Sequence, residues 1–402
     1  MTRDIGTGGG SVAVTGLRIG VVGGSIAGCA MAIAATRAGA EVTVHERSDG
    51  ALQERGFGIV MPPSLHRELL ASGYLGADME TVPVGTRVWL TRAPGGRSTR
   101  ELARQRAPVA ACNWGLLWRA LRGRVGAGVY RRGLPVESVA RAASGRGVIR
   151  TGDGEREYDI VVGADGYGSV TRGRMAPDVR PLPAGYLAWR GTVPLDVLGD
   201  LPGPLELLRG AWATLGFPGG HAVFYVIPGP DPGSRLLAYV VYGAAPRGTG
   251  PDAYVHELAG EHFPAEWAEV VARGGAGARG VHPVADFMPP RVAEPPFLLA
   301  GDAAGVTRPH TASGAVKALQ DALCLERALR GGAASVAEAL GRYADERTAE
   351  GIRLVELGRR LGHHLVERTP DWAAMGPAEV EAWSRAALNG ARSYLYGGVH
   401  RP

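Results

Sequence analysis

Residues 17–28 read Leu-Arg-Ile-Gly-Val-Val-Gly-Gly-Ser-Ile-Ala-Gly and predict the turn around which this fold is organised. The apolar run from Leu17 to Val22 is typical of a buried strand, and the alanine-rich run from Ile26 to Ala38 is typical of a helix. Residues 40–45 alternate back into a strand. A strand, a glycine-rich turn, a helix and a second strand within about 30 residues form a unit that binds dinucleotides. We therefore expect an α/β domain that begins here.

The individual positions of this turn suit a pyrophosphate group. Gly23 would permit the tight turn, and Gly28 would let the helix that begins at Ile26 pack closely on the strand. Ser25 stands where this fingerprint usually has its middle glycine, so the match is imperfect. The N-terminus of the helix would then face the phosphates. Glu46 ends the second strand, where a carboxylate accepts hydrogen bonds from ribose hydroxyls. A tight turn without a ligand is the alternative, and the register of strand, helix and Glu46 favours binding.

Two further glycine-acid motifs follow along the chain. Residues 163–166 read Gly-Ala-Asp-Gly, and by itself this pattern is as typical of an ordinary Asp-Gly turn around Asp165 as of a ligand site. Gly301-Asp302 follows a short apolar run, where a carboxylate can bind a polyol hydroxyl. The helix start at residues 312–314 has unpaired N–H groups that can stabilise negative charge on a reduced ring. The order of all three motifs favours a ligand over three separate turns.

The remaining pattern divides the chain into an α/β part and a β-rich part. Runs of β-branched and aromatic residues between 185 and 242 predict an antiparallel sheet, and residues 312–329 and 336–364 predict helices. We expect a flexible N-terminus over 1–16 and C-terminal helices over 331–402. We expect a discontinuous nucleotide-binding domain over 17–75, 105–180 and 275–330, with a β-sheet substrate domain over 76–104 and 181–274.

Composition excludes several other classes of protein. The 402 residues carry a net charge of +5, but the basic residues are scattered among acids, which argues against a nucleic-acid partner. Cys29, Cys112 and Cys324 have no metal-ligand spacing and fit a reducing cytoplasm, so we expect no metal site. No uncharged apolar stretch reaches the roughly 18–20 residues that span a bilayer, so we expect no membrane partner.

The three motifs, which extend from Leu17 to about Leu329, resemble those of the single-component FAD-dependent aromatic hydroxylases of the p-hydroxybenzoate hydroxylase type. The resemblance implies an α/β fold: a Rossmann-like FAD-binding domain of the glutathione-reductase type, an inserted antiparallel-sheet substrate domain and a helical C-terminal tail. Further segments are similar to the 2,6-dihydroxypyridine 3-hydroxylase branch of this family: 23–26, 46–48, 56–58, 185–186, 189–191, 301–304 and 308–310.

The resemblance also implies a reaction. FAD would be reduced by NADPH or NADH as a transient co-substrate, and O2 would then form a flavin C4a-hydroperoxide that oxygenates a small aromatic or N-heterocyclic substrate. A homodimer is consistent with the sequence. One position departs from the pattern, because many relatives have an FAD-contacting arginine where this chain has Asn113-Trp114-Gly115.

The site residues predicted from motifs and resemblance fall into three groups. His310 and Arg308 are the catalytic candidates: His310 would accept a proton from a ring hydroxyl, with a hydrogen bond to the backbone as the equally weighted alternative. The cofactor-binding candidates are Gly23, Ser25, Ile26, Gly28, Glu46, Arg47, Gly58, Asp165, Gly301, Asp302, Pro309, Ala312 and Gly314. The substrate-pocket candidates are Trp189, His221, Tyr225, Tyr242 and Pro309.

Two other functions stay open from the sequence. The same cofactor chemistry can give Baeyer–Villiger-type insertion or oxidative rearrangement, which the connectivity of the product would distinguish from hydroxylation. A non-enzymatic FAD-binding redox sensor is the alternative from a different class. Substrate-dependent NAD(P)H oxidation that yields an oxygenated product would exclude the sensor.

Overall fold

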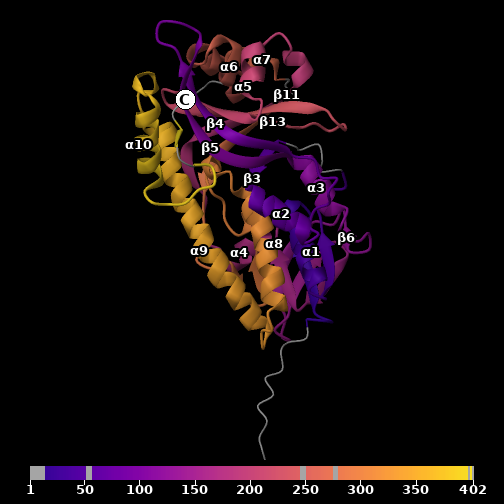
Figure 1. Cartoon of the computed structure of the whole chain (residues 1–402). Coiled ribbons are helices and arrows are strands. Elements are labelled where there is room, and N and C mark those ends of the chain that lie inside the picture. Colours follow the sequence, from indigo (N-terminus) through magenta and orange to yellow (C-terminus); the bar gives the residue numbers. More distant parts are fainter. Residues whose placement is uncertain (1–13, 51–56, 245–249, 275–278, 397–398, 401–402) are drawn as a thin grey trace, which may run out of the picture.

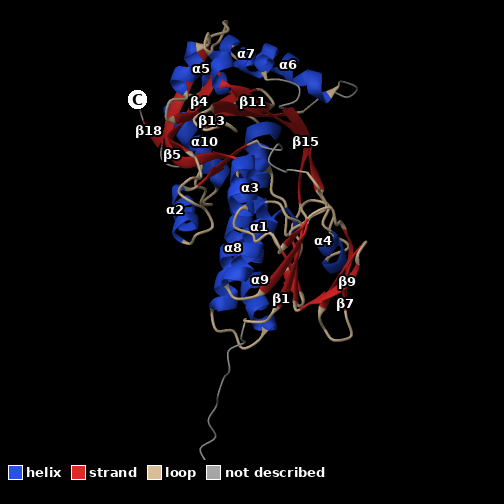
Figure 2. Ribbon diagram, turned by 90° about the vertical axis from the view of Figure 1, so that its right-hand side faces the viewer, coloured by secondary structure: helices blue, strands red, loops and turns tan. Residues whose placement is uncertain are grey.

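The structure is a computed structural model that describes residues 14–50, 57–244, 250–274, 279–396 and 399–400. Of the N-terminal segment expected to be flexible, residues 1–13 lie outside the described residues, as does Gly56. Figures 1 and 2 show a lower α/β lobe and an upper lobe built on a large sheet. The helix α9 (Val336–Gly362) runs along both lobes and joins them.

The lower lobe is built on a six-stranded sheet, as far as the described residues show, in the order β16-β17-β10-β1-β2-β6. Its strands β17, β10, β1, β2 and β6 are parallel, and the short β16 is antiparallel to β17. The strands are β1 (Arg18–Val22), β2 (Glu41–His45), β6 (Tyr130–Arg131), β10 (Ile160–Gly163), β16 (Ala293–Glu294) and β17 (Phe297–Leu299).

Both faces of this parallel sheet are covered, which explains its continuous apolar runs. Val162 and Leu298 lie in the core beneath α1 (Ile26–Arg37) and α8 (Gly314–Arg330). Val161 and Phe297 point to the opposite face, against a three-stranded antiparallel sheet. That small sheet consists of β7 (Val136–Arg141), β8 (Gly147–Thr151) and β9 (Gly154–Tyr158). The lobe also contains α2 (Pro63–Ala71), α3 (Trp114–Arg122) and α4 (Val170–Met175).

The upper lobe is a mostly antiparallel sheet in the order β15-β11-β14-β13-β12-β4-β5-β18, with β3 paired to β5. Its strands are β3 (Gly58–Met61), β4 (Val82–Arg92), β5 (Thr99–Asn113), β11 (Leu182–Pro194), β12 (Ala211–Phe217), β13 (Gly220–Pro228), β14 (Arg235–Gly243), β15 (Arg279–Asp286) and β18 (Val399–His400). Its outer face is covered by α5 (Pro202–Leu207), α6 (Pro251–His262) and α7 (Ala265–Arg273). Its inner face faces the lower lobe and α9.

The upper sheet extends past the domain boundaries expected from the sequence. β5 continues to Asn113 and β15 spans Arg279–Asp286, although 105–113 and 279–286 were expected in the nucleotide-binding domain. The tail also contributes a strand, because Val399 pairs with Gln105. Alternating residues predict that a segment is a strand, whereas the choice of sheet depends on pairing between distant segments.

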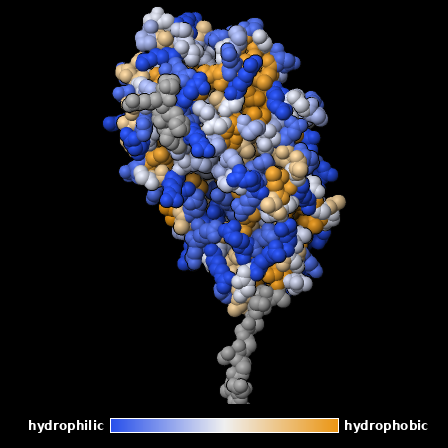
Figure 3. Space-filling model, viewed as in Figure 1, coloured by the Kyte–Doolittle hydropathy of each residue, from blue (hydrophilic) through white to orange (hydrophobic). Residues whose placement is uncertain are grey.

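The C-terminal region is largely helical and packs on both lobes. After α9 come a π-helical turn, η6 (His363–Glu367), a 3-10 turn, η7 (Trp372–Ala374), and α10 (Pro377–Leu388). On the face shown in Figure 3, apolar residues form small groups between hydrophilic ones. Among the described residues, no helix combines the length and apolarity needed to cross a membrane.

Candidate active site

The first glycine-rich turn is held open at the carboxyl end of β1. Gly23 has a φ of 94°, in the left-handed region, and its N–H donates to the carbonyl of His45 over 2.8 Å. Glu46 is buried, and its two carboxylate oxygens accept from the N–H groups of Gly24 (2.7 Å) and Ser48 (2.8 Å). Glu46 therefore lies directly against the turn, where the sequence predicted it.

The start of α1 is free to receive an anion. Its N-cap, Ser25, makes no side-chain capping hydrogen bond, and the first turn of the helix contains no acidic residue. A Cβ added to Gly28 would lie 1.9 Å from the carbonyl oxygen of Gly23, so only glycine allows this close contact. The first N–H groups of the helix thus point out of an uncapped, uncharged terminus, which is the arrangement that binds phosphate.

Two aromatic side chains that the sequence analysis did not single out hold this turn in place by hydrogen bonds. The indole of Trp118 on α3 donates to the carbonyl of Gly24 over 3.0 Å, and the hydroxyl of Tyr130 donates to the same oxygen over 2.9 Å. Both residues line a pocket of about 310 Å³ beside the turn. The other lining residues are Gly50, Arg119, Arg122, Gly123 and Arg132. The pocket combines aromatic rings with positive charge, which suits a nucleotide. Arg47, predicted as a cofactor residue, is exposed one residue after Glu46.

The second motif forms a capped turn at the start of α4. Asp165 accepts from the hydroxyl of Ser169 over 2.5 Å and from the N–H of Val170 over 2.7 Å. Burial raises the pKa of Asp165 above its ordinary value, and these hydrogen bonds oppose the shift. The N–H of Ala164, just before Asp165, donates to the carbonyl of Val22 over 2.8 Å, so the motif lies at the carboxyl end of β1. The first and second motifs therefore meet at one sheet edge.

The third motif is fixed by a buried ionic cluster that the sequence did not reveal. Gly301 has a φ of 58°, and its N–H donates to Asp321 over 2.8 Å. Lys317, which is 4% exposed and is the only lysine of the chain, donates to the carbonyl of Gly301. Arg347 on α9 completes the cluster with a 2.6 Å contact to Asp321. The side chain of Asp302 itself remains exposed and available to a ligand.

The segment between Asp302 and α8 bends sharply. Pro309 begins a short 3-10 turn, η5 (Pro309–Thr311), and Ala312 then adopts a left-handed φ of 49°. This conformation is uncommon for a residue other than glycine and indicates a tightly determined loop. Gly314 follows as the first residue of α8, whose N-cap has no side-chain capping bond. The helix start therefore keeps the free N–H groups that the sequence predicted.

The inner face of the upper sheet carries most of the predicted pocket residues. Tyr225 and Tyr242 belong to the inner core, and the ring of His221 stacks on Tyr242 with centroids 4.7 Å apart. Gly58 lies against this face, since a Cβ at Gly58 would be 2.5 Å from the hydroxyl of Tyr225. His221, Tyr225 and Tyr242 therefore lie together on this face, and Gly58, predicted as a cofactor residue, lies against them.

Trp189 is a correction to the predicted pocket. Its side chain belongs to the outer core and packs near Tyr254 of α6, with ring centroids 6.1 Å apart. Successive side chains of a strand point to opposite faces, and Ala188 of the same strand belongs to the inner core. Trp189 therefore faces away from Tyr225 and Tyr242, and we remove it from the candidate pocket.

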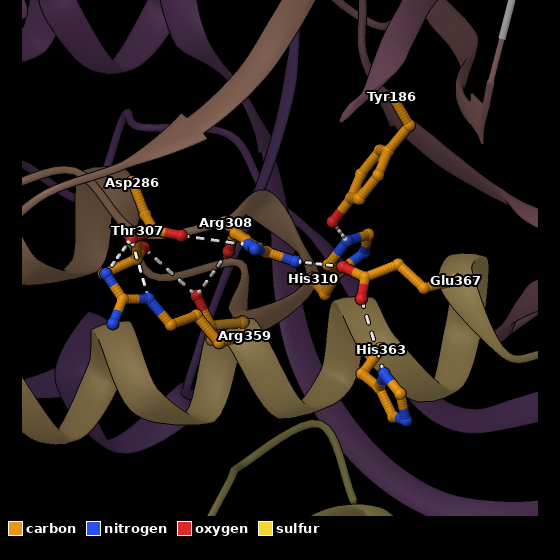
Figure 4. Close-up of polar contacts among 9 residues, drawn as sticks. Tyr186, Asp286, Thr307, Arg308, His310, Arg359, His363 and Glu367 are labelled. Carbon is orange, nitrogen blue, oxygen red and sulfur yellow. Dashed lines mark hydrogen bonds and ion pairs between the residues drawn. The ribbon is translucent and has the colours of Figure 1, made fainter. Parts of the chain in front are cut away.

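Arg308 is the centre of a buried ionic network (Figure 4). Its Nε is 3.0 Å from a carboxylate oxygen of Asp286, and its Nη1 is 2.5 Å from Glu367. Asp286 is completely buried and also accepts from Arg359 over 2.6 Å. His363, which is 47% exposed, lies 3.3 Å from Glu367 at the solvent side of the network. With two carboxylate partners, Arg308, which lies directly before η5, joins this turn to β15 and to η6.

His310 is buried among aromatic rings next to this network. Its Nε2 is 2.6 Å from the hydroxyl of Tyr186, and its ring centroid is 4.7 Å from that of Tyr242 and 5.1 Å from that of His221. Burial, with a further contribution from Arg308, lowers the pKa of His310 to about 3. The imidazole is therefore neutral near pH 7. This differs from the sequence expectation of a base whose pKa lies near neutrality, because burial penalises the charged form.

Comparison with known proteins assigns the family. The sequence model described as FAD binding domain matches residues 116–357, more than half of the chain, and that described as pyridine nucleotide-disulphide oxidoreductase matches residues 18–73. The chain is 30% identical to 2,6-dihydroxypyridine 3-monooxygenase of Paenarthrobacter nicotinovorans, over 77% of this chain and 81% of that protein. The chain belongs to the FAD-dependent monooxygenases.

Two further comparisons agree with this family. The monooxygenase is 29% identical to 3-amino-4-hydroxybenzoate 2-monooxygenase of Streptomyces cremeus, over 87% of this chain and 88% of that protein. Its fold matches the solved structure of 2,6-dihydroxypyridine-3-hydroxylase from Arthrobacter nicotinovorans with a TM-score of 0.79 and 24% identity, over 96% and 98% of the two chains. The expected α/β fold, FAD binding and enzyme class are confirmed.

The monooxygenase replaces one family feature with a local cap. At the position where the sequence lacks the expected arginine, the side chain of Asn113 accepts from the N–H of Gly115 over 2.8 Å and begins α3. Its amide also donates to the carbonyl of Pro228 over 3.3 Å and ties α3 to the end of β13. Asn113 therefore has a structural role that explains the departure.

Several residues around the site were missed by the sequence prediction. Tyr186, Asp286 and Glu367 support Arg308 and His310, and each comes from a segment remote in sequence. Lys317 gave a signal that could have been used, because a lone lysine among many arginines is unusual in composition. Tyr186 lies in the segment 185–186 that resembles the hydroxylase branch, but this resemblance gave it no role, and Asp286 and Glu367 carried no sequence signal beyond their residue type.

Proposed function

We propose that this monooxygenase uses NADPH or NADH and O2 to insert one oxygen atom into a small electron-rich aromatic or N-heterocyclic ring. The observation that carries the proposal is the aromatic inner face formed by His221, Tyr225 and Tyr242, which lies beside η5. Aromatic residues with a few polar groups suit a flat ring with polar substituents. The names of the relatives, which act on a dihydroxypyridine and an aminohydroxybenzoate, support this substrate class.

The residues present fit FAD. The uncapped start of α1 with Gly28 suits the pyrophosphate, and the buried Glu46 beside the turn suits the adenosine ribose. The arginine-lined pocket suits the adenosine part, and the exposed Asp302 suits the ribityl chain. The uncapped start of α8 suits the electron-rich edge of the flavin ring. When bound, FAD would supply electron transfer from NAD(P)H and the activation of O2.

The protein's part is to bind, orient and enclose the reactants. We propose that Tyr225 and Tyr242 hold the substrate ring by stacking and edge contacts, and that Gly58, by lacking a Cβ, lets β3 pack closely against Tyr225. Pro309 and Ala312 fix the loop between the inner sheet face and the α8 start. This position lets the loop exclude water from the reacting ring, which protects a reactive oxygenating species. Arg308 keeps that loop attached to β15 and η6.

We expect purified protein to be yellow, with FAD that is released on denaturation, because the three motifs supply no covalent attachment. With FAD bound, a panel of hydroxylated pyridines and benzoates should reveal substrates that accelerate NADPH or NADH oxidation. Under ¹⁸O2 the product should gain one ¹⁸O atom, with the second oxygen atom reduced to water. Product NMR then distinguishes hydroxylation from ring insertion. NAD(P)H oxidation that forms only hydrogen peroxide with every compound would contradict the proposal.

We expect Glu46→Ala to raise the FAD dissociation constant about 10- to 100-fold, because a charge-assisted hydrogen bond contributes about 1.5–3 kcal/mol. Asp302→Ala should weaken FAD binding by a similar amount. Fluorescence titration of the FAD-free protein measures both. Glu41→Ala is the control, because Glu41 is exposed at the other end of the same strand as Glu46. Unchanged FAD affinity in both site variants would show that the cofactor binds elsewhere.

A further inference from the structure

Figure 4 shows the ionic network around Arg308 beside the hydrogen bond that joins Tyr186 to the imidazole of His310. Asp286 and Glu367 fix the guanidinium of Arg308, as described above. Arg308 also donates a hydrogen bond to the phenolic oxygen of Tyr186. The same hydroxyl is 2.6 Å from Nε2 of His310. Tyr186 thus stands between a permanent cation and a neutral imidazole.

The backbone of α9 closes around this arrangement. A Cβ added to Gly362 would lie 2.5 Å from the hydroxyl oxygen of Tyr186 and 2.9 Å from Nη1 of Arg308. Both groups therefore pack against α9 at its last residue, directly before the π-helical turn η6. This close contact leaves the Tyr186 oxygen little freedom to seek other partners.

The protons of these hydrogen bonds can be placed from the chemistry of the groups. Arginine has no acceptor atom, so its N–H must point at the Tyr186 oxygen. Among the described residues, Nε2 of His310 is the acceptor that lies within hydrogen-bond distance of the Tyr186 hydroxyl, so the phenolic proton points at Nε2, which accepts it. A neutral imidazole that accepts at one nitrogen carries its proton on the other. Nδ1 of His310 therefore bears a hydrogen, and that buried atom has no partner among the described residues.

We propose that Arg308 and Tyr186 hold His310 as a neutral, Nδ1-protonated imidazole that donates a hydrogen bond to an oxygen or nitrogen acceptor of the bound ring. The part about the ring rests on the proposed function, whereas the protonation state does not. A preorganised donor of this kind stabilises negative charge that develops on a carbonyl or phenolate oxygen. This role replaces the proton acceptor expected from the sequence, because the buried nitrogen that is left without a partner already carries a proton.

The groups that face His310 favour this state over a wide pH range. The cation of Arg308 opposes a second positive charge on the ring, and burial raises the pKa of Tyr186, so the phenol keeps its proton. Tyr242 likewise has its pKa raised by burial, to about 12, and burial lowers the pKa of the neighbouring His221 well below its ordinary value. Glu367 and Asp286 are the nearby anions, and both are engaged with Arg308.

The test is ¹⁵N NMR of FAD-loaded protein labelled with ¹⁵N-histidine, with the His310 signals assigned by their loss in His310→Gln. We expect a protonated Nδ1 and an unprotonated Nε2 that stay unchanged from about pH 6 to pH 9. A proton on Nε2, or titration of the ring in this range, would overturn the proposal. This readout requires no substrate, so failure of the proposed function and failure of this assignment are separate results.

Tyr186→Phe tests the cause of the assignment, because it removes only the hydroxyl. We expect His310 to lose its preference for the Nδ1-protonated tautomer, so that it shows either both tautomers or a proton on Nε2. Tyr254→Phe is the matched control on the outer face of the sheet and should leave the His310 signals unchanged. An unchanged Nδ1-protonated state in Tyr186→Phe would show that Tyr186 does not set the tautomer.

The role as a donor is tested with a substrate found in the ¹⁸O2 assay. His310→Ala should lower coupled product formation about 10²–10³-fold, the usual effect of losing one preorganised donor. His310→Gln, whose amide can donate, should retain at least about ten times the rate of His310→Ala, with a pH profile parallel to that of the unmodified protein. Product formation in His310→Ala at the rate of the unmodified protein would overturn the donor role.

Discussion

Gly28→Ala is expected to be purified with about a tenth or less of the FAD carried by the unmodified protein. The added methyl group would lie 1.9 Å from the carbonyl oxygen of Gly23. Either α1 moves away from β1 or the turn opens, and forced overpacking of this kind costs typically about 1–3 kcal/mol. Both movements displace the helix N-terminus from the position that suits the pyrophosphate. The ratio of flavin to protein absorbance measures the loss.

The control for this experiment is Gly341→Ala on α9. A Cβ at Gly341 meets no atom within 4 Å, so this variant should keep its FAD and gain slightly in helix stability. Circular dichroism of Gly28→Ala separates loss of the cofactor from loss of the fold. Folded Gly28→Ala protein that contains a full complement of FAD would show that the pyrophosphate does not lie at this turn.

Acid should destabilise this protein strongly between about pH 6.5 and pH 5. Burial lowers the pKa of His310 to about 3 and that of His45 to about 4, from an ordinary value of 6.5. Below pH 6.5 the unfolded chain takes up these protons and the folded protein does not, so stability is full above pH 6.5 and is lost as the pH falls. Each histidine should cost about 2 kcal/mol by pH 5. The raised pKa of Asp165 acts in the opposite sense.

Urea unfolding at pH 7.5 and pH 5 measures this loss. His45→Gln removes one titrating group while keeping a polar atom near its partner, the hydroxyl of Tyr158, 2.9 Å from Nε2 of His45. The variant should therefore lose about 2 kcal/mol less between the two pH values. The difference between the proteins is the informative quantity, because the carboxylates contribute equally to both. Identical pH dependence would contradict the assignment of His45 as a buried neutral group.

The part of the site that could be predicted from sequence is the part built from contiguous residues. Gly23, Gly28 and Glu46 lie in one strand–helix–strand unit, so their spacing alone brings them together. The contact between Tyr186 and His310 joins residues 124 positions apart, and that between Arg308 and Glu367 joins residues 59 apart. Such contacts depend on the packing of whole elements. No local pattern encodes them.

Trp189 shows the same limit on a smaller scale. The alternation along β11 correctly places Trp189 on the opposite face of the sheet from its neighbour Ala188. It does not show which of the two faces meets the lower, FAD-binding lobe. That face is decided by α6 and α7, which lie far along the chain and cover the side to which Trp189 points. The proton acceptor expected at His310 was revised for a related reason. Sequence gives the ordinary pKa of a histidine, whereas its surroundings set the actual one.

Because Lys317 is the only lysine and is buried, this protein should react unusually with reagents that modify amines. A reagent that acylates amines would meet Lys317, the single side-chain amine of this sequence, only behind the Gly301 turn. Under mild conditions, the Lys317 amine should therefore be modified slowly. Slow modification of Lys317 would then report how often the segment around Gly301 opens, and added FAD should slow that reaction if it closes the segment. Mass spectrometry would time this opening in the intact protein without any introduced probe.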